Sequence, residues 1–586
     1  MIRYDKMNEA IGHNWYRVDP NLRFQMDRFI APEDRQWVEE KMDAMGELMG
    51  TVVAANAEIT DKHPPQLVRW DKRGEEINQV VHHPTSLDTK RHLWKAGFLG
   101  LPWSEETEKR GRPVPENLML AYLYLLNQAE TGMACSVGMT NGVLRLVQRH
   151  ADEATKKRFL PKLTSLDFDK AYDGSMFITE RAGGSDVGAI ESTARFDGKV
   201  WRVSGFKWFC SNVDGKAIAV LARPEGAPPG IKGLALYVIP KFLEDGTHNG
   251  IHIRRIKDKL GTKAVPTGEV DLVEAEGYLL AGPEKNALDG RGINRMMEMV
   301  TESRLGVASM GAGIMRRAFL DAAIYATQRE AFGKKLEDHG MVREEILRLM
   351  VESEGASAMY FKCGALVTEA GGMSAKQGAF VRVLVPLAKM RCTRRAIEST
   401  TAALEIFGAN GYIENWPTAR QFRDAQCHTI WEGPENVIAL DVLRSMAKEN
   451  AHMAGVSYIE EALDGASHKL LTEPRETVGK GLAKLNQALA FIAGADPEIA
   501  QLRARRLANF FADVLQGALF LDEAAWELEK RGTARKALVA ALFTRDRLSP
   551  DPLREITRAD RIALDLYHPL TRYEDITPAE AAKHLA

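Results

Sequence analysis

The feature of this sequence that most constrains its fold is a β-rich segment enclosed between long helical segments. From about residue 170 to 280, short apolar runs such as 217–222 and 234–239 alternate with Gly, Asp and Pro turns, a pattern typical of strands. Segments 33–62 and 117–161 instead repeat apolar residues every three or four positions, which predicts amphipathic helices. We therefore expect a mainly α protein with a central β domain.

A second helical region follows the β-rich segment. Residues 286–448 show the helical period in long stretches, which suit a bundle of packed antiparallel helices. We place a break near 452–456 and a further helical block at 478–567. Candidates for one buried face of that block are Leu502, Phe510, Val514 and Leu521. The sequence thus predicts four parts: an N-terminal helical domain with an extension at 1–168, a β domain at 169–285, a helical bundle at 286–450 and a C-terminal helical domain at 451–586.

The composition excludes several classes of protein. Lys and Arg number 78 against 80 Asp and Glu, a net charge of −2, so no overall field draws the chain to nucleic acid. The five cysteines show no CxxC spacing, which argues against a disulfide framework and favours a reducing compartment. The N-terminus is charged where a signal peptide would be apolar, and no run of about 18 apolar residues occurs. We expect a cytoplasmic protein without membrane insertion.

Several common catalytic signatures are incomplete or absent. The stretch around Ser185, GGSDV, lacks the second glycine that a nucleophile elbow needs. The glycines of segment 311–313 are followed by Arg316, where a dinucleotide-binding motif has its third glycine. No GxxxxGK[ST] or HExxH motif occurs, and the adjacent His82 and His83 would face opposite directions on a strand. We therefore expect neither P-loop nor hydrolase chemistry, and no metal site.

Two stretches rich in glycine and hydroxyl residues lie between expected strands. They read MFITERAGGSDV at 176–187 and VSGFKWFCSN at 203–212. Such loops let backbone amides and short side chains approach a large polar ligand. The first resembles the TEPxAGSD stretch of the acyl-CoA dehydrogenase family, and the second resembles its GxKxWITN stretch.

Further motifs resemble the same family in the same order along the chain. They are KLGTKAVPTGEVDL at 259–272, QREAFGKKLEDH at 328–339, IFGANGY at 406–412 and IWEGPEN at 430–436. Segment 64–84, PPQLVRWDKRGEEINQVVHHP, and the long C-terminal helical extension are similar to the AidB-like, alkylation-response branch. The resemblance implies a helical domain, a β-barrel-like domain and a four-helix bundle, followed by a C-terminal helical domain.

The resemblance also implies a reaction and its base. The family removes an α-proton and a β-hydride from an acyl-CoA thioester, which needs a carboxylate in a desolvated pocket as base and a flavin as hydride acceptor. Glu432, in IWEGPEN, matches the family base, although an acid at a helix start also suits the helix dipole. Some relatives carry the base one residue before the arginine of TESRLG. That position is Ser303 here, and Glu302 beside it is a minor rival.

The expected cofactor is FAD, and the resemblance assigns residues to it and to the substrate. Ser211 stands where the family has a threonine near flavin N5, and Phe209 replaces a tryptophan beside the ring. Arg329 is expected to clamp the FAD pyrophosphate across a subunit boundary. The expected flavin contacts are Phe177, Ile178, Thr179, Gly184, Ser185, Phe209, Ser211, Arg329, Phe332, Gly408 and Gly411, and the expected substrate contacts are Ser185, Arg304, Trp431 and Gly433.

The resemblance further implies partners, and two rival functions stay open. Electron-transfer flavoprotein is the expected electron acceptor, and the chain is expected to form a homodimer or homotetramer. One rival is a DNA-associated stress flavoprotein, but residues 456–586 hold 18 Lys and Arg against 20 Asp and Glu, so only a local patch at Arg503, Arg505 and Arg506 would serve DNA. The other rival is a flavin oxidase on the same fold. Trp431 and Pro434 replace a usual tyrosine and threonine, which suggests an unusual substrate, and the acyl chain itself is not defined by the sequence.

Overall fold

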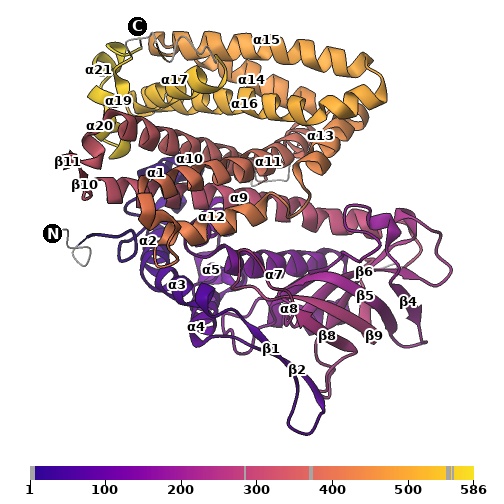
Figure 1. Ribbon diagram of the computed structural model, residues 1–586. Coiled ribbons are helices and arrows are strands. Elements are labelled where there is room, and N and C mark those ends of the chain that lie inside the picture. The colour runs from indigo at the N-terminus through magenta and orange to yellow at the C-terminus, as the bar shows by residue number, and fades with distance from the viewer. Residues whose placement is uncertain (1–6, 283–285, 368–373, 550–555, 557–559, 586) are drawn as a thin grey trace. The chain divides into compact units, whose positions relative to one another are not determined.

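The chain forms two compact units in the computed structural model (Figure 1). The structure describes residues 7–282, 286–367, 374–549, 556 and 560–585, so the expected end of the β domain at 285 lies outside the described residues. Unit 1 comprises Met1–Thr51, Pro115–Gln128 and Val307–Ala586, and unit 2 comprises Val52–Val114 and Ala129–Gly306.

Unit 2 contains the β domain that the sequence predicts. Its strands are β3 (Gly174–Phe177), β4 (Thr193–Phe196), β5 (Trp201–Ser211), β6 (Ala217–Pro224), β7 (Ala235–Pro240), β8 (Ile251–Ile256) and β9 (Thr267–Leu279). They form a seven-stranded sheet in the order β3-β6-β4-β5-β9-β7, with β8 paired to β9. An additional pairing of β6 with β7 closes this path on itself, so the sheet is barrel-like.

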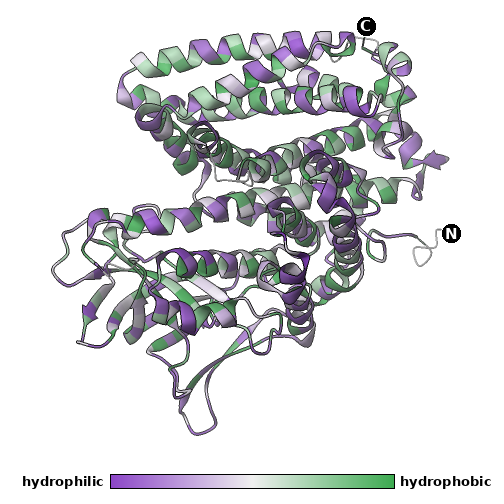
Figure 2. Ribbon diagram, turned by 180° about the vertical axis from the view of Figure 1, so that it is seen from behind, coloured by the Kyte–Doolittle hydropathy of each residue, from purple (hydrophilic) through white to green (hydrophobic). Residues whose placement is uncertain are grey.

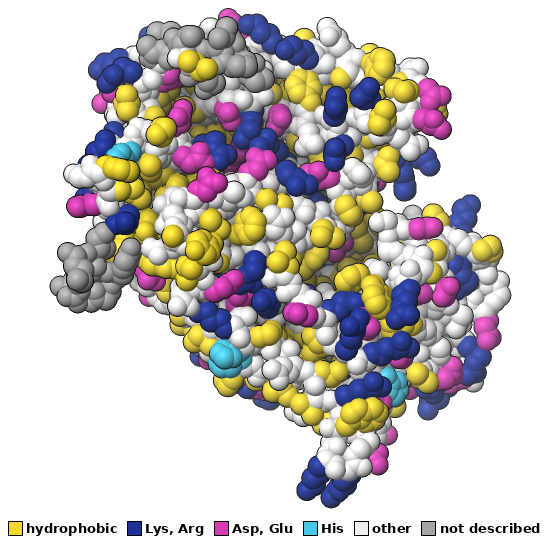
Figure 3. Space-filling view, viewed as in Figure 1, with side chains coloured by type: hydrophobic (Ala, Val, Ile, Leu, Met, Phe, Trp, Pro, Cys, Tyr) yellow, Lys and Arg dark blue, Asp and Glu magenta, His cyan; other side chains and the backbone are white. Residues whose placement is uncertain are grey.

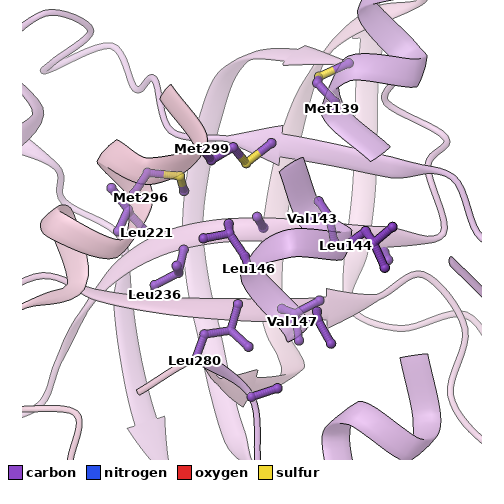
Figure 4. Packing of buried hydrophobic residues seen from close by; sticks show 14 of the residues in the cluster. Met139, Val143, Leu144, Leu146, Val147, Leu221, Leu236, Leu280, Met296 and Met299 are labelled. Carbon is purple, nitrogen blue, oxygen red and sulfur yellow. The ribbon is translucent and has the colours of Figure 1, made fainter. Parts of the chain in front are cut away.

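The central strands are buried on both faces, which explains their continuous apolar runs. Successive side chains of a strand point to opposite faces. On β6, Ala219 and Leu221 pack in a cluster with Val147 of α7 (Thr131–His150), whereas Ile218 and Val220 pack in a second cluster inside the sheet. Figure 4 shows the first cluster, with α7 lying against the sheet. Each buried Leu or Val stabilises the fold by about 1.5–3 kcal/mol.

The remaining elements of unit 2 are helices and one hairpin. The helices are α3 (Ala54–Lys62), α4 (Pro84–Lys95), α5 (Glu105–Arg110), α7 and α8 (Glu153–Leu163). The hairpin of β1 (Gln66–Trp70) and β2 (Glu76–Val81) was not expected from the sequence. Lys72 and Arg73 lie in its turn, and Figure 3 shows basic side chains at the tip of this hairpin. The segment that resembles the AidB-like branch, 64–84, therefore contains a projecting hairpin.

Unit 1 is helical. Its main helices are α1 (Pro20–Phe29), α2 (Arg35–Leu48), α6 (Glu116–Ala129), α9 (Gly292–Ala326), whose second half belongs to this unit, α10 (Gly340–Val367), α11 (Ala375–Ile406), α12 (Pro417–His428), α13 (Glu435–Glu449), α14 (His452–Gly465), α15 (Thr472–Gly494), α16 (Pro497–Lys530) and α17 (Arg535–Arg547). Hydrophobic and hydrophilic residues alternate along outer helices such as α15 (Figure 2), whose buried residues recur every three or four positions, whereas α10 is buried on all sides from Leu349 to Phe361. Among the described helices, none is long and apolar enough to cross a membrane.

Two sequence expectations about the C-terminal region are wrong. The expected break at 452–456 lies inside α14, because α13 ends one turn earlier at Asn450, which adopts the left-handed conformation of a helix C-cap. Val514 and Leu521 are buried as expected, but Leu502 is 65% exposed. Leu502 lies near the start of α16, on the side that faces solvent.

A network of buried charges joins the C-terminal helices to the rest of unit 1. The Lys536 ammonium on α17 lies 2.7 Å from carboxylate oxygens of both Glu354 on α10 and Glu523 on α16, and donates to Asn21 of α1. Arg535 also pairs with Glu354. Burial raises the pKa of the Glu354 carboxyl, but the charges of Arg535 and Lys536 outweigh burial and lower this pKa to about 2. The C-terminal helices thus share a core with the bundle.

Replacing Lys536 with Met tests this network. The variant Lys536→Met leaves two carboxylates buried with one cation fewer, so we expect the free energy of unfolding to fall by about 3–5 kcal/mol. The matched control Lys530→Met changes a lysine that is 56% exposed on α16, and we expect a change below about 0.5 kcal/mol. Denaturant unfolding followed by circular dichroism measures both. Equal stability of the two variants would contradict the network.

Candidate functional site

The TERAGGSD stretch follows strand β3 in unit 2 and forms a tight loop. The backbone amide of Glu180 donates to the carbonyl of Gly183 at 2.9 Å. A Cβ atom on Gly183 would lie only 2.1 Å from the carbonyl oxygen of Asp186, so this position requires glycine. Gly184 and Ser185 are exposed at the loop surface. The two expected ligand contacts of this loop are therefore accessible.

A buried ion pair fixes this loop to strand β5. The Lys207 ammonium is fully buried and lies 2.6 Å from a carboxylate oxygen of Glu180, while it also donates to the carbonyl of Leu221 at 2.9 Å. Glu180 in turn accepts from the Ser192 hydroxyl and the Glu191 amide. Burial lowers the pKa of Lys207, and Glu180 opposes this shift. Both residues lie in the sequence motifs, but their pairing is not evident from the motifs.

The three expected contacts that precede the loop differ in exposure. Phe177 is fully buried in the sheet cluster, so neither its ring nor its backbone is exposed. Ile178 and Thr179 are half-buried. The Thr179 carbonyl accepts from the Trp208 amide at 2.8 Å, which ties the start of the loop to β5.

Strand β5 presents an aromatic ring and a hydroxyl at its end. The pairing of β5 with β9 shifts between Lys207 and Cys210, a bulge that includes Trp208 and Phe209. Phe209 is 53% exposed, with the Lys257 ammonium 4.7 Å from its ring centroid. The hydroxyl of Ser211 lies 3.0 Å from that of Thr267 across the strand pair. An exposed ring beside hydroxyl groups suits a flat, polar ligand.

The TESRLG segment lies in the part of α9 that belongs to unit 2. Arg304 is buried, with 7% of its surface exposed. Glu302, the rival base, forms ion pairs with Arg145 at 3.4 Å and Arg149 at 3.8 Å on α7. Glu302 therefore links α9 to α7 through these ion pairs.

In unit 1, the IWEGPEN stretch forms the loop between α12 and α13. Trp431, Glu432 and Gly433 are half-buried. Glu432 has a φ of 55° and Gly433 a φ of 106°, so two consecutive residues are in the left-handed region. A glutamate in this region costs on the order of 1–3 kcal/mol and is retained where the surroundings impose it. Such strain is common at functional positions.

Two buried residues underlie this loop. Lys389 of α11 is fully buried, and its ammonium donates to the carbonyls of Thr429 at 3.1 Å and Gly433 at 2.6 Å. His428 is also fully buried, and neither ring nitrogen has a hydrogen-bond partner among the described residues. Its ring packs edge-on to Trp431, with centroids 5.6 Å apart. Burial, with a smaller contribution from Lys389, lowers the pKa of His428 to about 3, so the ring is neutral.

The RxxFG stretch forms a hairpin directly after α9. Strands β10 (Glu330–Ala331) and β11 (Lys334–Lys335) are joined by Phe332 and Gly333, which both have positive φ. Phe332 is 98% exposed. Its left-handed backbone conformation is unfavourable for a bulky residue. Arg329 is half-buried at the base of the hairpin.

The FGANGY stretch packs on the end of α9, just before Arg329 in the chain. Phe407 stacks on Tyr325 of α9 with ring centroids 4.1 Å apart, and the Asn410 side chain donates to the Tyr325 hydroxyl. Gly411 has no room for a side chain, because a Cβ atom would lie 2.1 Å from the Leu404 carbonyl oxygen. Gly408 has a φ of 61° and open space around it. The FGANGY stretch thus contacts α9 through Tyr325, four residues before Arg329.

The expected site residues therefore form groups within each unit. Unit 2 groups the glycine loop with Phe209 and Ser211. Unit 1 contains the strained Glu432 loop and the linked arginine and glycine segments. Sequence reasoning missed Lys389 and His428, for which the sequence carries no local signal, and it missed the role of the pair Glu180 and Lys207.

Models of three domains match the chain in the expected order. The N-terminal domain of the adaptive response protein AidB matches residues 6–170. The middle domain of acyl-CoA dehydrogenase matches residues 175–274, and its C-terminal domain matches residues 290–447. Glutaryl-CoA dehydrogenase from Desulfococcus multivorans is 30% identical over 395 residues, which cover 66% of this chain and 93% of the relative. The chain belongs to the acyl-CoA dehydrogenase family.

Within the acyl-CoA dehydrogenase family, the chain is similar to long members. The putative acyl-CoA dehydrogenase AidB from Escherichia coli is 29% identical, over 72% of this chain and 76% of the relative. The crystal structure of Caenorhabditis elegans ACDH-11 in complex with C11-CoA is similar with a TM-score of 0.85 at 26% identity, over 95% of this chain and 96% of that chain. The family, the AidB-like branch and the fold expected from the sequence are confirmed.

A double-mutant cycle tests the ion pair beneath the glycine loop. Lys207→Met leaves the Glu180 carboxylate buried without its cation, so we expect the free energy of unfolding to fall by about 3–5 kcal/mol. Adding Glu180→Gln removes the unpaired charge, and we expect the double variant to lose less than the sum of the two single variants by at least about 1 kcal/mol. Urea unfolding measures the cycle, with Lys199→Met in an exposed turn as control. Additive losses would contradict direct pairing.

The pKa of His428 gives a test by pH. Unfolded histidine binds a proton below about pH 6.5, whereas His428 in the folded state stays neutral down to about pH 3. His428 therefore contributes a loss of stability as pH falls below 6.5, which approaches about 1.4 kcal/mol per pH unit. His428→Phe lacks this histidine. We therefore expect its free energy of unfolding, relative to that of wild type, to rise by about 2 kcal/mol as pH falls from 6.5 to 5. A stability difference between the two proteins that does not change with pH would contradict a neutral buried His428.

Proposed function

We propose that this protein is an FAD-dependent acyl-CoA dehydrogenase that desaturates an acyl-CoA thioester between its α and β carbons. The observation that carries the proposal is Glu432. Glu432 matches the family's base position by its motif, it lies in a half-buried loop, and its backbone has a strained φ of 55°. A carboxylate in such a position is suited to take the α-proton of a thioester. After the carboxylate takes the α-proton, the β-hydride would transfer to an acceptor on the opposite face of the substrate.

Each unit, taken by itself, contains residues that suit FAD. When bound, FAD supplies the hydride acceptor at its N5 atom. In unit 2, Phe209 offers an exposed ring, and the hydroxyls of Ser211 and Thr179 suit the polar edge of an isoalloxazine. In unit 1, Arg329 suits a pyrophosphate, and the backbone at Gly408 is open to close approach.

The substrate and partners follow from the same family assignment. Glu432 acts as the base, and Trp431 and Gly433 beside it contact the thioester, with Arg304 and Ser185 as further contacts. Relatives are named for acyl-CoA substrates, and ACDH-11 is described with C11-CoA. Three large apolar residues of unit 1, Phe332, Tyr412 and Ile430, are 98%, 67% and 65% exposed. Their exposure favours a homo-oligomer, in which a second copy covers them, and electron-transfer flavoprotein is the proposed acceptor.

Two alternative functions, a DNA-associated flavoprotein and a flavin oxidase, can be distinguished from the proposed dehydrogenase by experiment. Arg503, Arg505 and Arg506 are exposed on one turn of α16 and would be the contact of a DNA-associated flavoprotein. A flavin oxidase would share every residue of the proposed site and differ in the acceptor. Oxygen consumption with an acyl-CoA identifies the oxidase, and salt-dependent DNA binding lost in an Arg503→Ala, Arg505→Ala, Arg506→Ala variant identifies the first rival.

The test is anaerobic mixing of the purified flavoprotein with a panel of acyl-CoAs while the absorbance of oxidised flavin is followed. We expect one class of acyl-CoA to bleach the flavin, and Glu432→Gln to slow bleaching by about 10²–10⁴-fold because it removes the base. The control Glu414→Gln removes an acid that is 59% exposed and pairs with Arg423, and it should leave the rate unchanged. Bound flavin that no acyl-CoA reduces would overturn the proposal.

A further inference from the structure

A buried lysine contacts both ends of the loop that carries Glu432. The Lys389 ammonium donates to the carbonyl of Thr429 at 3.1 Å, at the end of α12, and to that of Gly433 at 2.6 Å, directly after Glu432. One side chain of α11 therefore joins two points of the chain, and three residues of the loop lie between them. Those three residues include the proposed base.

Burial makes these hydrogen bonds obligatory. Lys389 is fully removed from solvent, and an ammonium without acceptors in such a place costs several kcal/mol. Both of these acceptors are backbone carbonyl oxygens of the loop, so the loop backbone itself satisfies donors of the buried ammonium. The loop can leave its position only if the ammonium loses its acceptors. The geometry of the loop is thus coupled to the solvation of Lys389.

The loop needs such a restraint because its backbone is strained. Glu432 and Gly433 have φ values of 55° and 106°, and left-handed backbone at a glutamate persists where surrounding contacts impose it. His428 supplies no hydrogen bond to the loop in the part of the chain that the structure describes, and it packs on Trp431 through its ring. The hydrogen bonds from Lys389 to the carbonyls of Thr429 and Gly433 provide a polar restraint on the loop.

We infer that Lys389 is a positioning residue that holds the Glu432 loop in its strained, reactive conformation through the carbonyls of Thr429 and Gly433. It acts through the loop backbone and does not touch the substrate. Its catalytic consequence rests on the proposed function, whereas its effect on the loop does not. Lysine suits this role because its ammonium has three donors at the end of a long stem, and two acceptors at different places can share them.

Hydrogen exchange measured by mass spectrometry tests the positioning without any activity. In Lys389→Met, we expect peptides that cover 429–436 to exchange at least about 10-fold faster, whereas peptides of α15 and α16 keep their wild-type rates. The matched control is Lys376→Met on the same helix, at a lysine that is 62% exposed and paired with Glu461. Unchanged exchange at 429–436 in Lys389→Met would overturn the inference, and so would an equal increase throughout unit 1.

Kinetics test the consequence for the reaction. In Lys389→Met, we expect the rate of flavin reduction to fall by about 10- to 100-fold while the Kd of the acyl-CoA changes less than about 3-fold, because the base is displaced and the ligand is still bound. If Lys389→Met does not fold, Lys389→Gln, which keeps a donor, replaces it, and intermediate values of both quantities are expected. A loss confined to acyl-CoA binding would overturn the inference. Faster exchange at 429–436 in a protein whose wild type reduces no flavin would support the positioning and contradict the proposed function.

Discussion

The burial of lysine ammonium groups is the constraint on which the arrangement of this protein depends. Lys207, Lys389 and Lys536 are all at most 1% exposed, and each must find acceptors because an unpartnered buried charge is too costly. Lys207 finds the carboxylate of Glu180, and Lys389 finds the carbonyls that bracket Glu432. Lys536 finds two carboxylates from different helices. In each case the lysine and its acceptors belong to different elements of the chain.

These contacts connect the fold to the proposed chemistry. A catalytic group must be held within a fraction of an ångström of its productive position, and loops alone rarely achieve this. Here the glycine loop of unit 2 and the Glu432 loop of unit 1 are each anchored by a lysine from a neighbouring strand or helix. The C-terminal helices share the core of the bundle through Lys536, so they are an integral part of unit 1.

The sequence predicted what depends on local pattern and missed what depends on distant contacts. The long helices and the central strands followed from periodicity, whereas the hairpin of β1 and β2 did not. The motifs that led to the family place glycines where side chains do not fit, as at Gly183 and Gly411. The bulge at Phe209 and the partners of Lys389 involve residues far apart in the chain, so no local signal carried them. The break expected at 452–456 was wrong because a left-handed Asn450 ends α13 without a proline or glycine to mark it.

The central claim is that the protein removes an α-proton and a β-hydride from one acyl-CoA. The most direct measurement is the anaerobic rate of flavin bleaching by an acyl-CoA that carries deuterium at the α carbon, the β carbon or both, compared with the unlabelled compound. The account predicts that deuterium slows bleaching at each position. Bleaching at the same rate with all four compounds, or consumption of acyl-CoA without bleaching, would contradict it.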